Sequence, residues 1–409
     1  MENKKRIEKI LLPTELYKQL EIDEEQAAKL EVLDASAQGI SFKSLTKQAQ
    51  TLRGRWWVIP TVISLIYLVF GYWNYMIQAI VQHQSVRMLL YTTQDTKYAS
   101  VENIAVSGLV FISTPLLLIA YLITRRKLSG LMGRRTYWLV LPALLIAWYL
   151  LTSTIFDLLF KVMNSIFPGV ILDIFTAIFL ATLIIAGVNY LLISFINHFS
   201  LIGIKNLLGI MIASGVTSAA LNSGKSNWWQ RHFSYLGSSF TKDNYTFNLT
   251  LIIVGFLLAI LFDRLMTQLV RKYNQTPIRF NFFRLWLILC GISLSCVGLF
   301  PNNGNIRGGW VSMVHNVVAG LIVLFLLICM IGIQGWLPQA GRHFYGYTYV
   351  LLAGLVVVVG LFYGIHYLSL TAFELLSFTL AFAWLFSLIK LLTDLVKYDN
   401  RVYLVVESE

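Results

Sequence analysis

The sequence predicts an all-α fold, a polytopic bundle of about ten transmembrane helices preceded by a short helical cytoplasmic arm. Hydrophobic residues make up 57% of the 409 residues and charged residues only 13%, whereas soluble domains carry roughly 25% charged residues. The apolar residues gather into stretches of about 20, the length a helix needs to cross a bilayer. The formal net charge of +12 is concentrated beside these stretches, as the positive-inside rule expects, so it does not indicate a nucleic-acid partner.

Ten stretches satisfy this length criterion. They lie at approximately Trp57–Ile80, Ile104–Thr124, Tyr137–Phe156, Val170–Phe195, Leu201–Leu221, Thr246–Met266, Phe282–Phe300, Ser312–Trp336, Tyr345–Ile365 and Ser369–Leu392. With the N-terminus in the cytoplasm, the basic loops Thr124–Arg135 and Asp263–Phe280 and the basic C-terminal tail all lie inside. Nine or eleven spans would place one of these basic clusters outside.

The spans divide the chain into four parts. These are a cytoplasmic arm (residues 1–55), a four-span region (56–197), a six-span domain (198–396) and a cytoplasmic tail (397–409). The arm is polar and lacks the apolar centre of a cleavable signal peptide, so the first span is expected to act as the insertion signal. Its helix-forming residues, with Pro13 at a helix start, predict a solvated amphipathic arm. Docking of a cytoplasmic protein partner on residues 1–55 is the alternative.

Polar residues collect in the predicted extracytoplasmic connections around residues 228–248, 300–316 and 364–369. Ionisable groups at a membrane edge are costly, which makes them candidates for a functional site. The candidate ligand-binding residues are Trp228, Trp229, Arg231, His232, Ser234, Gly237, Asn248, Pro301, Asn302, Arg307, His315, Asn316, His366 and, in the last span, Glu374.

His315 is expected just inside the eighth span. It either forms a hydrogen bond that fixes helix packing, or joins Asn316 in contacting a lipid headgroup or a small solute. A metal triad of His232, His315 and His366 is a third interpretation, since imidazole suits zinc. Their spacing is irregular and no carboxylate lies close to them in sequence, so we predict no metal site.

Carboxylates within the predicted spans need partners. Glu374 lies about one and a half turns into the last span, and we expect it to be protonated or paired with a basic group such as Arg307 or His315. Such a group would serve a proton-coupled transporter or a structural pair. Asp157 and Lys161 have the i,i+4 spacing of a structural ion pair, which Asp173 could join.

Recognised catalytic patterns are absent from the sequence. It contains no phosphate-binding loop, no G-x-S-x-G and no H-E-x-x-H. The cysteines Cys290, Cys296 and Cys329 lie in apolar stretches and form no Cys-x-x-Cys pair, so buried thiols are expected. We therefore predict no cofactor and no catalytic residue, and a protein that is not an enzyme.

Four short motifs, in order, resemble a bacterial membrane family called domain of unknown function 998. They are Ser234 with Leu236 and Gly237, Phe247-Asn248, Gly298 with Phe300-Pro301, and His315-Asn316. The resemblance covers roughly residues 201–392 and implies a six-helix membrane bundle from a bacterium, without an established chemistry. The family is also similar to the eukaryotic damage-regulated autophagy modulator group, which implies a link to membrane lipid.

The leading functional hypothesis is a cell-membrane protein with an extracytoplasmic polar pocket that binds lipid headgroups or a small solute. Trp228 and Trp229 suit the headgroup level. A secondary transporter using Glu374 and His315 is the first alternative, although matching halves with broken helices are not evident in the sequence. A scaffold that acts through its cytoplasmic arm is the second.

Overall fold

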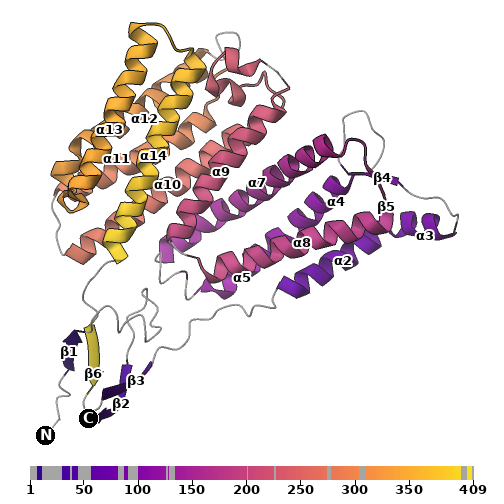
Figure 1. The fold of residues 1–409 in the computed structure, drawn as a ribbon, viewed down its shortest axis with the longest axis horizontal. Helices are drawn as coiled ribbons and strands as arrows, with labels where there is room; N and C mark the ends of the chain where they lie inside the picture. The colour runs from indigo at the N-terminus through magenta and orange to yellow at the C-terminus, as the bar shows by residue number, and fades with distance from the viewer. Residues whose placement is uncertain are drawn as a thin grey trace.

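The computed structural model describes residues 7–11, 30–36, 39–44, 57–81, 87–90, 100–125, 128, 134–199, 201–224, 227–273, 278–303, 309–397 and 403–407. Most of these residues are helical, and the helices form two groups that lie side by side (Figure 1).

The first group contains the helices that precede residue 198. They are α2 (Val58–Gly71), α3 (Trp73–Val81), α4 (Val101–Gly108), α5 (Thr114–Ile123), α7 (Arg134–Ile166) and α8 (Ile174–Asn197), and a π-helical turn, η2 (Leu109–Ser113), joins α4 to α5. The short strands β4 (Arg87–Leu89) and β5 (Ile171–Asp173) pair antiparallel at one end of this group.

The second group contains the helices from α9 onward. They are α9 (Leu201–Asn222), α10 (Asn244–Tyr273), α11 (Ile278–Leu299), α12 (Gly309–Trp336), α13 (Gly341–Val359) and α14 (Leu370–Lys397). Four short helical turns connect them: η3 (Trp228–Gln230), η4 (Phe233–Gly237), η5 (Pro338–Ala340) and η6 (Gly360–Gly364).

Nine helical segments among the described residues are long and apolar enough to cross a membrane, which confirms the prediction of a polytopic helical bundle. The first of the ten predicted spans differs from the rest because it is broken at Tyr72 into α2, of 14 residues, and α3, of 9 residues. Gly71 ends α2, and glycine has a low helix propensity because it loses the most backbone entropy. Together α2 and α3 cover the predicted Trp57–Ile80 span.

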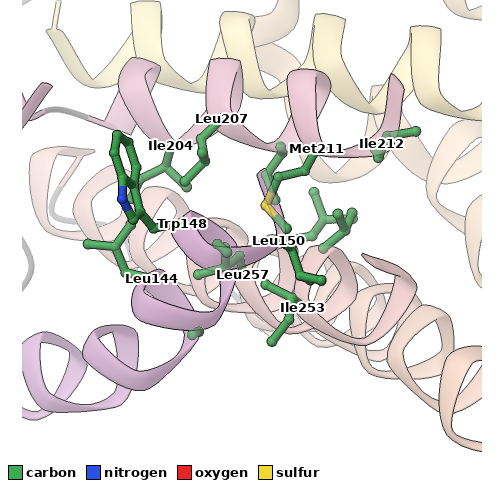
Figure 2. Close-up of a cluster of buried hydrophobic side chains, with 14 of the residues drawn as sticks. Leu144, Trp148, Leu150, Ile204, Leu207, Met211, Ile212, Ile253 and Leu257 are labelled. Atoms are coloured by element: carbon green, nitrogen blue, oxygen red, sulfur yellow. The ribbon is translucent and has the colours of Figure 1, made fainter. Parts of the chain in front are cut away.

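Helix α7 joins the two groups. Figure 2 shows its buried side chains Leu144, Trp148 and Leu150 against α9 and α10. The facing side chains include Ile204, Leu207, Met211 and Ile212 of α9, and Ile253 and Leu257 of α10. Since lipid is as apolar as these residues, the contact is stabilised by close van der Waals packing rather than by removal from water.

Helix α10 is the most enclosed part of the second group, with 67% of its span buried, against 28% for α12 and 11% for the segment containing α13. Its backbone approaches that of α11 closely, because a Cβ atom placed on Gly255 would lie 2.5 Å from the carbonyl oxygen of Gly291. The Ser295 hydroxyl of α11 also donates to the carbonyl of Ile252 at 2.8 Å. Small residues thus permit helix contact here, as is common in membranes.

Polar contacts tie α7 to α9 near the end of the first group. The predicted pair of Asp157 and Lys161 is confirmed, with 3.0 Å between Oδ2 and Nζ. Asn222 of α9, rather than Asp173, joins this pair by donating to the same oxygen at 2.7 Å. The Asp173 carboxylate instead caps α8, accepting from the N–H groups of Phe175 and Thr176 at 3.0 Å.

The prediction of a helical N-terminal arm is wrong for the arm residues that the structure describes, which form strands. Strands β2 (Leu30–Ser36) and β3 (Gly39–Ser44) form an antiparallel hairpin. The physical reason is visible in β3, where apolar Ile40 and Phe42 alternate with polar Ser41 and Lys43 in the period of two that favours a strand.

Strand β1 (Ile7–Leu11) pairs antiparallel with β6 (Tyr403–Glu407), which brings the two ends of the chain together beside the helical groups (Figure 1). Paired strands must lie on the same side of a membrane. The chain between residues 11 and 403 therefore crosses the membrane an even number of times, so α2 and α3 count as one crossing beside the nine long segments.

Candidate functional site

Three connections meet at one end of helices α9 to α14, which we call the loop end. They comprise residues 227–243 between α9 and α10, residues 300–303 after α11, and residues 364–369 between α13 and α14. In Figure 1 the loop end is the upper end of the second group. The first connection is folded into the turns η3 and η4, so its backbone is ordered by local hydrogen bonds.

Glu374 of α14 holds the η4 turn. Its carboxylate accepts a hydrogen bond from the backbone N–H of Phe233, and the backbone of Ser234 also hydrogen-bonds to it. These N–H groups begin η4, and the first N–H groups of a helix have no acceptor within the helix. Glu374 therefore supplies the acceptor that His232, the N-cap residue, does not supply. His315, one of the two partners expected for Glu374, contacts another group, and the second, Arg307, lies outside the described residues.

Arg231 and His232 surround the ring of Tyr235. The guanidinium carbon of Arg231 lies 5.7 Å from the ring centre, within the range of a cation–π contact. The His232 ring meets Tyr235 edge-on at 5.9 Å, and Phe240 stacks near Tyr235 at 6.3 Å. Arg231 is exposed, and among the described residues no carboxylate forms a salt bridge with it.

His232 is half-buried, and its Nδ1 atom is buried without a hydrogen-bond partner among the described residues. Burial lowers the pKa of His232 below its ordinary value, and the positive charges of His315 and Arg231 lower it further. A neutral imidazole with an unpaired nitrogen can accept or donate one hydrogen bond. This atom is thus the unsatisfied polar group of the site.

The motif residues Gly237, Asn248 and Gly298 hold the loop end together. The side-chain amide of Asn248 donates to the carbonyl of Gly237 at 2.8 Å. A Cβ atom on Gly237 would lie 2.2 Å from Asn248 Oδ1, and one on Gly298 would lie 2.4 Å from the Asn248 carbonyl oxygen. The glycines are therefore required by close approach, and we assign Gly237 and Asn248 to packing rather than to ligand contact.

His315 joins α12 to the end of α11. Its Nδ1 atom lies 2.7 Å from the carbonyl oxygen of Phe300, so Nδ1 carries the proton and donates it. The side chain is buried, with 4% of its surface exposed. This is the packing role that was one of the two expectations for His315. Asn303 adds a second link, because its Oδ1 accepts from the Ser239 N–H at 2.8 Å.

The remaining predicted residues separate into two sets. Trp228, Ser234, Pro301 and Asn302 are half-buried at the loop end. His366 is exposed, with a positive φ of 55°, and Asn316 is exposed on α12, while Trp229 has 54% of its surface exposed. Among the described residues, no three His, Cys, Asp or Glu side chains are gathered as metal ligands would be.

Two contributors were missed by the analysis of the sequence. Tyr235 provides the ring that Arg231 and His232 share. Thr371, 6% exposed, lies three residues before Glu374 on the same face of α14, and its hydroxyl oxygen is buried without a partner among the described residues. The i,i+3 spacing from Glu374 was the available signal for Thr371.

Comparison with known proteins supports the resemblance. Residues 208–389 match the model of a family described as "Protein of unknown function (DUF998)". No curated protein and no solved structure matches the chain. The further resemblance to the damage-regulated autophagy modulator group stays a prediction. The matched segment runs from α9 to α14 and includes every residue of the loop end. Over residues 208–389 the chain therefore belongs to this membrane family of unknown function.

Proposed function

We propose that this membrane protein is not an enzyme and that its loop end binds the headgroup of an anionic lipid. The carrying observation is Arg231, an exposed cation that is held against Tyr235 and has no carboxylate partner among the described residues. Arginine presents a planar fork of N–H donors that fits the oxygens of a phosphate group.

The surroundings of Arg231 support a lipid as the ligand. Trp229 precedes it by two residues and is largely exposed, as expected of a side chain at headgroup level. The buried nitrogen of His232 offers a second polar contact beside the cation. Glu374 fixes the start of η4 directly after these residues, so the cation is presented by an ordered turn.

We place the loop end on the extracytoplasmic side as part of this proposal. The opposite ends of the helices carry the greater number of basic residues, which favours the cytoplasm for those ends. These residues include Arg125, Arg134, Arg135, Lys205, Arg264, Arg279, Arg342 and Lys390.

The test is the lipid content of the purified protein. Arg231→Ala is expected to reduce the anionic phospholipid retained after detergent purification by about tenfold, since charged hydrogen bonds contribute roughly 1.5–3 kcal/mol. Arg231→Lys should retain part of it, because lysine keeps the charge but not the fork. Arg279→Ala is the matched control, an exposed arginine at the opposite helix ends. Native mass spectrometry measures the bound lipid.

Three results would contradict the proposal. Equal lipid retention by Arg231→Ala and Arg279→Ala would remove the role of Arg231. Retention of a small water-soluble anion in place of lipid would assign the site to a solute. Proteoliposome uptake that requires a proton gradient and is lost in Glu374→Gln would support a transporter instead.

A further inference from the structure

One face of α12 presents polar and small residues to the outside of the bundle. Its inward face carries the buried residues Ser312, His315, Leu326, Cys329, Met330 and Ile333. The opposite face carries Met313, Asn316 and Gly320, which are all exposed. In the motif His315-Asn316, His315 therefore points into the bundle and Asn316 points away from it.

Asn316 lies at membrane depth. It follows Trp310, an exposed tryptophan near the start of α12, by six residues, which is about 9 Å along a helix. The tryptophan suits the interface between headgroups and hydrocarbon, so the carboxamide lies below it. No hydrogen bond joins this side chain to another described residue, and a carboxamide without a partner in hydrocarbon is costly.

We infer that this face of α12 binds the same face of a second copy of the protein, with the two Asn316 carboxamides paired across a twofold axis. A carboxamide has both donors and an acceptor, so two of them satisfy each other, whereas a lipid chain satisfies neither. Asparagine side chains are known to join transmembrane helices in this manner. Self-complementarity makes a second copy the occupant that the chemistry fits.

Gly320 allows the two helices to approach. It lies one turn below Asn316 on the same face, and a Cβ atom there would meet nothing within 4 Å. A glycine on a contact face permits close backbone packing in membranes. Gln334, also exposed, follows Asn316 by 18 residues, which is about five turns. A second carboxamide thus lies on the same face toward the other end of α12, and in a parallel pair it would face its own copy.

The first test is disulfide formation in lipid vesicles. Met313→Cys places a thiol on the proposed contact face, and Val359→Cys is the control, an exposed position on α13 at a similar distance from the loop end. Cys296→Ser in both variants removes a half-buried native thiol. Mild oxidation is expected to give a band of twice the monomer mass for Met313→Cys at least fivefold more than for the control. Equal cross-linking, or a product of any other mass, overturns the inference.

The second test measures the role of the carboxamide. Asn316→Leu has a similar volume but forms no hydrogen bond, so it is expected to weaken dimerisation in lipid on the order of tenfold. Counting subunits by single-molecule photobleaching at several protein-to-lipid ratios gives the dimer fraction. Single steps at all ratios for the unaltered protein, or an unchanged dimer fraction in Asn316→Leu, overturn the inference. Neither test depends on lipid binding by Arg231.

Discussion

The carboxylate of Glu374 on the last helix accepts a hydrogen bond from the backbone N–H of Phe233, 141 positions earlier in the chain. A negative charge at the start of a helical turn is favoured by the partial positive charge of the free N–H groups. A carboxylate that appears isolated within an apolar span is thereby satisfied by backbone atoms. The contact also ties the connection between α9 and α10 to α14, which closes the second group of helices.

Removal of this carboxylate should detach the η4 turn. Glu374→Ala leaves the Phe233 N–H without an acceptor, which costs about 1–3 kcal/mol when the group is buried. Glu374→Gln keeps an acceptor oxygen and should lose less. Hydrogen exchange at the Phe233 amide and the free energy of unfolding in detergent both measure the effect, with the exposed Thr379→Ala of α14 as control. Unchanged exchange in Glu374→Ala would disprove the docking role.

Acid should loosen the loop end through His232. Its pKa is lowered by burial and by the charges of His315 and Arg231, so the neutral form is favoured when the turn is docked. A free histidine titrates near pH 6.5. The contribution to stability is therefore fully present above about pH 6.5, and it is lost as pH falls from there toward the lowered value.

The check is the thermal midpoint of the protein between pH 5.5 and 8, compared with that of His232→Gln. Glu374, which binds the adjacent N–H, is present in both proteins, so its own titration cancels in the comparison. We expect a smaller decrease in the variant below pH 6.5. Parallel curves for the two proteins would exclude His232 as the source.

Gly298 should not tolerate a methyl group. A Cβ atom there meets the backbone carbonyl oxygen of Asn248 at 2.4 Å, and backbone cannot move aside as a flexible side chain can. Gly298→Ala is expected to destabilise the protein by about 1–3 kcal/mol through overpacking. Gly346→Ala on α13 is the control, since nothing lies within 4 Å of its Cβ position, and alanine there should be neutral or stabilising by up to about 1 kcal/mol. Equal effects would contradict the close approach of α10 and α11.

Asn222 should contribute to the contact between the two groups of helices. It donates to Asp157 on α7 at 2.7 Å and also hydrogen-bonds to Asp243 before α10. Burial raises the pKa of Asp243, while its hydrogen bonds to Thr246 and Asn222 lower it. Asn222→Ala should reduce the free energy of unfolding by about 1 kcal/mol, while Asn227→Ala, which is exposed, should have little effect. Equal losses in both variants would argue against a bridge.

The helical membrane fold could be predicted from sequence because the signal is physical and long. Each span needs about 20 apolar residues, and nine of the ten predicted spans correspond to long helices in the structure. The break at Tyr72 was not predictable from apolar content, since both halves are equally apolar. The strands near the N-terminus were missed because segments rich in Glu, Ala and Lys there favour helix, while the pairing of β1 with β6 depends on residues almost 400 positions away.

The candidate site was predicted only in part. The spacing of polar residues in three separate connections correctly indicated that the residue 227–243 connection, Asn303, His315 and Glu374 lie at one end. It could not show that backbone groups would be the partners, because main-chain N–H and C=O groups leave no mark in a sequence. Gly237 and Asn248 were attributed to ligand contact for the same reason.

The antiparallel pairing of β1 with β6 makes the polypeptide nearly a closed ring. A few residues would suffice to join strand to strand, since paired strands lie about 5 Å apart. A permuted gene could then begin at the connection between α10 and α11, which is on the same side of the membrane as both strands. Every helix would keep its direction of insertion, although α11 would now be the first to enter the bilayer.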